Sequence, residues 1–164
     1  MTRIDAARIE DVPLILELVR ALAAYEHLAH AVVATEQVLR EELFGPRAVA
    51  EAVIAREGDE PVGFALFFHN LSTFLGRRGL YLEDLFVLPE HRGRGVGRLM
   101  LRHLAGLAVE RRCGRLEWAV LDWNEPAIGF YRSLGARAMD DWTVYRLEGE
   151  DLRRLADESP GAER

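Results

Sequence analysis

Residues 85–98 read LFVLPEHRGRGVGR, and this stretch decides how the rest of the chain is interpreted. The apolar run at 85–88 is typical of a strand, and Pro89 ends it. Three glycines, each two residues from the next, then lead into an amphipathic pattern that predicts a helix. The first amides of a helix have no partner within it, and the helix dipole places partial positive charge there. The stretch therefore predicts a site for a phosphate or diphosphate group.

The spacing of the glycines distinguishes several other interpretations of this loop. The simplest is a glycine-rich turn that only begins a helix. A nucleotide P-loop ends in Gly-Lys-Ser/Thr, whereas residues 97–99 are Gly-Arg-Leu. A dinucleotide site needs G-x-G-x-x-G. Counted from Gly93, the third glycine comes one residue early at Gly97, although Glu117 stands where a ribose-binding acid is expected. What remains is Arg-x-x-Gly-x-Gly at 92–97, after an apolar strand.

Outward from the loop, hydrophobic periodicity predicts a mixed α/β fold of the α+β kind, with helices flanking one sheet. The element order is β-α-α-β-β-β-α-β-α-β. The predicted strands are 2–6, 49–56, 62–68, 80–88, 116–121 and 142–147. The predicted helices are 11–30, 35–44, one opening at the glycine loop, and 124–135.

Composition limits the classes of function. The chain has 164 residues, which suits a single domain, expected at 1–157 with a polar tail at 158–164. A net charge of −6 disfavours a nucleic-acid partner. The single cysteine, Cys113, leaves no internal disulfide. No apolar run reaches membrane-spanning length and no secretion signal opens the chain, so we expect a cytoplasmic protein without a membrane partner.

A pair of acids interrupts the strand before the loop. Without Glu83 and Asp84 this strand is apolar on both faces. Strict alternation places Tyr81, Leu85 and Val87 on one face and Leu82, Phe86 and Leu88 on the other. Buried carboxylates need cationic or hydrogen-bonding partners. Both acids could be structural, accepting backbone or arginine donors. Alternatively, Glu83 faces an amine and takes its proton.

Tyr131 follows Asn124-Glu125-Pro126, a cap, an acid and an early proline that together predict a helix start. The tyrosine is either an ordinary core or rim aromatic, or a phenol that donates a proton to a leaving group. His27 and His30 stand three residues apart, but no third ligand accompanies them, so no metal site is expected.

Taken together, the segments 81–87, 92–98, 121–131 and 134–136 resemble the GNAT superfamily of N-acetyltransferases. Within it they look like the spermidine/spermine (diamine) and thialysine N-acetyltransferase family. Residues 22–26, Leu-Ala-Ala-Tyr-Glu, match it as well. The resemblance implies the GNAT fold, with a mostly antiparallel central sheet of about six to seven strands flanked by helices on both faces. It also implies a homodimer.

The resemblance further implies an enzyme that transfers acetyl from acetyl-CoA, its co-substrate, to a small-molecule amine by direct attack in a ternary complex. Catalysis would fall to Tyr131 as acid and Glu83 as base. The cofactor-binding residues would be Leu85, Phe86, Val87, Arg92, Gly93, Arg94, Gly95, Val96, Gly97, Arg98, Asn124, Glu125, Pro126, Ala127 and Tyr131. The substrate-binding residues would be Tyr25, Glu26, Glu83, Asp84, Glu117 and Trp118.

The chain also departs from the polyamine enzymes. Phe74 replaces a tryptophan common in the loop before the acidic strand, and the segment 137–141 is shorter. The sequence Leu-Asp-Trp-Asn at 121–124 is nearer to the relatives that prefer thialysine. The acceptor is thus a diamine, a polyamine or an amino acid with a terminal amine. A non-catalytic module that senses coenzyme A is the alternative from another class.

Overall fold

The computed structural model describes residues 1–158, so the predicted tail at 158–164 lies outside the described residues except for Glu158. The chain divides into two compact units, residues 1–121 and 122–164, and each is described by itself. Unit 1 contains the sheet and three α-helices. Unit 2 contains two short helices, α4 (Glu125–Ser133) and α5 (Gly149–Asp157).

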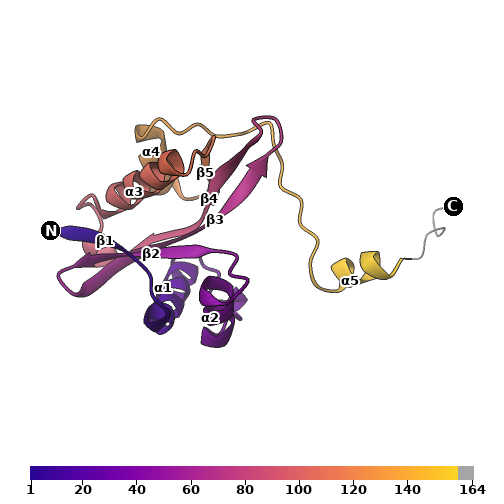
Figure 1. Cartoon of the computed structure of the whole chain (residues 1–164), viewed down its shortest axis with the longest axis horizontal. Helices are drawn as coiled ribbons and strands as arrows, with labels where there is room; N and C mark the ends of the chain where they lie inside the picture. Colours follow the sequence, from indigo (N-terminus) through magenta and orange to yellow (C-terminus); the bar gives the residue numbers. More distant parts are fainter. Residues whose placement is uncertain (159–164) are drawn as a thin grey trace. The chain divides into compact units, whose positions relative to one another are not determined.

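Unit 1 is built on a five-stranded sheet whose spatial order equals its chain order, β1-β2-β3-β4-β5. The first four strands pair antiparallel and β5 joins β4 in parallel. The strands are β1 (Thr2–Ala6), β2 (Glu51–Glu57), β3 (Glu60–Ser72), β4 (Arg77–Val87) and β5 (Leu116–Trp118). Figure 1 shows α1 and α2 beneath this sheet and α3 above it. The predicted mixed α/β architecture, a mostly antiparallel sheet with helices on both faces, is confirmed.

The long helices of unit 1 begin where their capping residues predict. The helix α1 (Val12–Tyr25) has Pro13 in its first turn, and α2 (Glu36–Phe44) is capped by Thr35, whose hydroxyl accepts from the Val38 amide. The helix α3 (Val96–Glu110) starts directly after the glycine loop. Three short 3-10 turns, η1 (Ile9–Asp11), η2 (Ala29–Ala31) and η3 (Pro89–His91), complete this unit.

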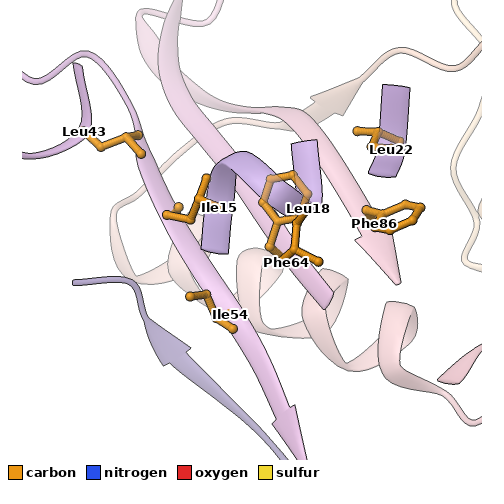
Figure 2. Close-up of a cluster of buried hydrophobic side chains, with 8 residues drawn as sticks. Ile15, Leu18, Leu22, Leu43, Ile54, Phe64 and Phe86 are labelled. Atoms are coloured by element: carbon orange, nitrogen blue, oxygen red, sulfur yellow. The ribbon is translucent and has the colours of Figure 1, made fainter. Parts of the chain in front are cut away.

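The core beneath the sheet is a cluster of aliphatic and aromatic side chains from α1 and the central strands. Ile15 and Leu18 of α1 pack with Phe64 of β3 and Phe86 of β4, as Figure 2 shows. Phe64 and Ile15 are fully buried. Burying an aliphatic or phenyl side chain contributes about 1.5–3 kcal/mol. This packing fixes the C-terminal end of α1 next to β4.

Two predicted element boundaries in unit 1 are wrong. The first helix ends at Tyr25 and not near His30, because His27 adopts a positive φ of 62° that a right-handed helix does not allow. The strand predicted to run to Leu121 pairs only at 116–118. Beyond Trp118 it parts from β4.

The predicted count of six to seven strands is also wrong, since the described residues contain five. The predicted strand at 142–147 has the β-favouring sequence Trp-Thr-Val-Tyr-Arg-Leu, but no pairing partner among residues 1–158. Trp142, Val144 and Tyr145 are largely exposed there. Local sequence favours extended backbone at such residues, whereas a strand also requires a hydrogen-bonded neighbour. Helix α5, at 149–157, was not predicted.

Candidate active site

Strand β4 carries a β-bulge at Glu83. In the register with β3, Asp84 lies opposite Leu66 and Leu82 lies opposite Phe67, so two successive residues of β3 face three of β4. Glu83 is the extra residue of the bulged strand. A bulge shifts the alternation of side chains along its strand, so residues before and after it no longer obey one period of two.

Asp84 lies on the face of the sheet that α1 covers, and the bulge places Tyr81 on that face as well. Asp84 pairs with Leu66, which packs against the α1 core cluster. Tyr81 lies on this face too, because it pairs with Phe68, two residues further along β3, and the two rings are 5.1 Å apart. The predicted strict alternation, which separated Tyr81 from Phe86, is therefore wrong. The extra residue at Glu83 is the physical reason.

The carboxylates of Glu83 and of Glu26, which follows the last residue of α1, lie near enough to Asp84 to act on its charge. Burial first, and then the negative charges of Glu83 and Glu26, raise the pKa of Asp84 to about 6. Burial also raises the pKa of Glu26. These neighbouring negative charges favour a positively charged ligand beside Asp84.

Tyr81 and Glu117 extend the acidic face toward β5. Burial raises the pKa of Tyr81, and so do the nearby carboxylates of Glu83 and Glu117. Glu117 already has partners, since it lies 2.7 Å from the Arg115 Nε and accepts from the Asn70 Nδ2 at 3.3 Å. Its charge is thus largely offset by Arg115.

Trp118, a predicted substrate residue, lies on the other face of the sheet from Asp84. It pairs with Leu82 in the parallel register, so the two share a face. Leu82 in turn shares its face with Phe67, whose ring is 5.9 Å from the guanidinium of Arg111 after α3. The structure therefore groups Glu26, Glu83 and Asp84 but does not add Trp118 to them.

Strands β4 and β5 separate just where the bulge begins. Their pairing covers only Leu80–Leu82 and Leu116–Trp118. From Glu83 to Val87, no strand of the described residues pairs with this edge of β4. Apart from the Val87 carbonyl, which accepts from Arg92, the backbone groups of 85–87 on this edge are thereby open to an extended ligand that pairs as a strand does.

The glycine loop follows β4 and turns through two left-handed residues. Gly93 has φ +74° and Gly95, the N-cap of α3, has φ +84°, values that favour glycine. Residues 92–95 are exposed. The amides of Val96 and Gly97 open α3 and have no acceptor within the helix. The loop therefore presents the donors and the dipole that an anionic ligand requires.

Arg92 anchors this loop to the sheet and to α1. Its Nε donates to the Val87 carbonyl at 2.9 Å, and its guanidinium lies 4.4 Å from the centre of the Tyr25 ring and 5.4 Å from that of Phe86. Stacking of a guanidinium on an aromatic ring is attractive. Tyr25, predicted to contact substrate, thus also holds the root of the loop. Arg94 and Arg98 are exposed further along.

The remaining predicted site residues belong to unit 2. The Asn124 side chain, 6% exposed, accepts from the Ala127 amide and caps α4, with Pro126 in the first turn. The predicted helix start is confirmed. Tyr131 lies in the last turns of α4, half-buried, with its ring 5.5 Å from that of Phe130. The roles of Asn124, Glu125, Pro126, Ala127 and Tyr131 stay predictions.

Residues 17–136, which span the bulged strand, the loop and the capped helix, match the model of the Acetyltransferase (GNAT) family. The chain belongs to the GNAT acetyltransferase family. It is therefore an acetyltransferase of the GNAT type. None of the helices described is long and apolar enough to cross a membrane, and residues 1–158 hold no group of three or more metal-ligating side chains.

Similar proteins span nearly the whole chain. The thialysine N-epsilon-acetyltransferase of Mus musculus is 36% identical over 94% of this chain and 97% of its own length. The L-ornithine N5-acetyltransferase of Arabidopsis thaliana is 31% identical over 94% of this chain and 87% of its own. Among solved structures, an integron cassette protein from V. cholerae superposes with a TM-score of 0.81 and 28% identity, covering 96% of this chain and 98% of that one.

The sequence of this GNAT chain did not indicate where three side chains near the site lie: those of Tyr81, His91 and Glu57. Tyr81 was assigned to the wrong face because the bulge leaves no mark in local periodicity. His91 directly precedes the loop motif. A polar residue just after an apolar strand is expected to contact other polar side chains, and this was the signal that the sequence offered. Glu57 lies 34 positions before His91, and only the fold brings the two side chains together.

Proposed function

We propose that the chain transfers the acetyl group of acetyl-CoA to a primary amine of a small molecule: a diamine, a polyamine or a lysine-like amino acid. The observation that carries this proposal is a pair of features that lie on either side of residues 85–92. A cation-favouring acid cluster lies at Glu83–Asp84, and an exposed, glycine-turned helix start lies at 93–97. Similarity to enzymes named for thialysine and ornithine supports the choice of amine.

The diphosphate of acetyl-CoA would bind the amides at 93–98, with Arg94 and Arg98 as charged donors. The pantetheine arm would pair with the open edge of β4 at 85–87. Further cofactor contacts would come from 124–127. The amine would enter between Tyr25, Glu26 and Asp84, where the negative charges of the carboxylates would attract its ammonium form. We also propose a homodimer, which sedimentation velocity tests directly.

Glu83 would act as base and Tyr131 as acid in one direct step. An alkyl ammonium has a pKa near ~10.4, so freeing its amine at pH 7 costs roughly 4–5 kcal/mol. Its proton passes to Glu83, directly or through water. The amine nitrogen then attacks the thioester carbonyl, a C–N bond forms and the C–S bond breaks. The departing thiolate takes the phenol proton of Tyr131, since a phenol remains protonated at neutral pH. The nitrogen loses its second proton as the amide forms, and this proton restores the phenol directly or through water.

The test follows free thiol release from acetyl-CoA with a panel of diamines, polyamines and lysine analogues. We expect amine-dependent release, reduced about 10²- to 10⁴-fold in kcat by Tyr131→Phe and by Glu83→Gln while coenzyme A affinity is kept. Glu110→Gln, at the end of α3, is the matched control and should keep wild-type rates. Coenzyme A binding without acetyl transfer to any amine would show a sensor instead. Wild-type rates in both test variants would refute the assigned roles.

A further inference from the structure

The junction between β4 and the glycine loop contains a buried histidine. His91 ends η3 and is only 7% exposed, although the loop residues after it are exposed. Its Nδ1 lies 3.3 Å from the Glu57 Oε2, and its Nε2 lies 4.0 Å from the Glu60 Oε1. The nearer contact lacks hydrogen-bond alignment, so it is a close packing contact between the two side chains. The root of the loop thus packs against the acids that flank the β2–β3 turn.

Glu57 is itself held in place and touches the loop twice. The Thr2 hydroxyl of β1 donates to its Oε1 at 3.1 Å. Its Oε2 contacts His91 and also lies 3.9 Å from the Arg94 Nη1. His91 and Arg94 stand on either side of Gly93, the first left-handed residue of the loop. One carboxylate therefore fixes the loop before and after its turn.

A second anchor holds the same loop from the opposite direction. Arg92 stacks on Tyr25 of α1 and donates to Val87 at the end of β4. Glycines give the backbone more conformations than other residues, so a loop that carries two of them needs outside contacts to keep one shape. Amides that bind an anion are effective when they are preorganised, because no ordering cost is then paid on binding.

We propose that Glu57 is a positioning residue for the diphosphate-binding loop, acting through His91 and Arg94; the inference rests on the proposed function. Glu57 does not touch the bound cofactor in this scheme. It keeps the amides at 93–97 in the arrangement that receives the diphosphate. The β2–β3 turn, which is distant in sequence from the loop, thereby becomes part of the cofactor site.

The sign of the effect separates this role from simple electrostatics. A carboxylate close to an anion site repels the anion, so neutralising it should tighten coenzyme A binding. If Glu57 positions the loop, Glu57→Gln weakens binding despite the removed repulsion. Glu60→Gln is the matched control, because Glu60 also lies beside His91 but is 69% exposed and has only the longer 4.0 Å contact.

The experiment measures the Kd of coenzyme A by calorimetry, and KM and kcat for acetyl-CoA with the best amine of the panel. For Glu57→Gln we expect Kd and KM to rise roughly tenfold, the loss of about one charged contact, with kcat within about twofold. The KM for the amine and the melting temperature should stay near wild type. Glu60→Gln should bind coenzyme A as tightly as wild type or slightly more tightly.

Thr2→Ala is the second test variant, because it removes the donor that holds Glu57 and leaves the charge in place. We expect a smaller rise of KM in the same direction. Unchanged or tighter binding by Glu57→Gln overturns the inference, as does an equal loss in Glu60→Gln. Failure of the wild-type protein to bind acetyl-CoA would instead refute the proposed function, so the two failures are distinguishable.

Discussion

Replacing Asp84 with asparagine should stabilise the fold at neutral pH. The pKa of Asp84 is about 6 in the folded chain, against 3.8 for an ordinary aspartate, first because of burial and then because of Glu83 and Glu26. A carboxyl whose pKa is raised by folding binds its proton more tightly in the folded state. Its contribution to stability is complete below pH 3.8 and is lost as the pH rises through about 6.

The gap between these two pKa values corresponds to about 3 kcal/mol of destabilisation once Asp84 is fully ionised. Asparagine has nearly the same shape and no charge. We therefore expect Asp84→Asn to raise the free energy of unfolding by about 2–3 kcal/mol at pH 7.5 and to leave it unchanged near pH 4. The same substitution should raise the KM for the amine, because the proposed amine site then has one carboxylate fewer to attract the cation.

Urea denaturation of both proteins at pH 4, 5, 6, 7 and 8, followed by far-ultraviolet circular dichroism, measures this difference. Asp59→Asn is the control, because the Asp59 side chain is fully exposed and its 3.5 Å ion pair with Arg3 lies at the surface. Its stability curve should follow that of the wild type. A saturating diamine should stabilise the wild type more at pH 8 than at pH 5. An Asp84→Asn variant that is less stable at pH 7.5, or whose stability difference is independent of pH, would refute the reasoning.

Two further substitutions test local features of the site. Gly95→Ala places a side chain on a residue with φ +84°, so it should lower the free energy of unfolding by roughly 1–2 kcal/mol and raise the KM for acetyl-CoA. Gly106→Ala is the control, because Gly106 lies inside α3 with open space around it, and it should be neutral or stabilising in thermal melts. Asn124→Ala removes the cap of α4 and should cost about 1 kcal/mol, measured as faster amide exchange in 125–133; unchanged exchange would contradict the capping role.

Local chemistry made much of this chain predictable from its sequence. Thr35 and Asn124 cap the helices that follow them, because capping depends on residues only three positions apart. The glycine loop and the start of α3 follow from glycine φ angles and helix geometry, which are also local. The short first strand and the apolar run at 62–68, which lies within β3, follow from the local preference of such residues for extended backbone.

Long-range pairing decided the rest. The bulge at Glu83 exists only in register with β3, and it alone places Tyr81 on the face that α1 covers, the face that also carries Asp84. The segment 142–147 has a strand's sequence, yet local preference cannot supply the neighbour that a strand needs. Glu57 meets His91 because β2 and the loop are brought together by the fold. Sequence determined which groups the site contains; tertiary contacts, which depend on residues distant along the chain, decided which of them face one another.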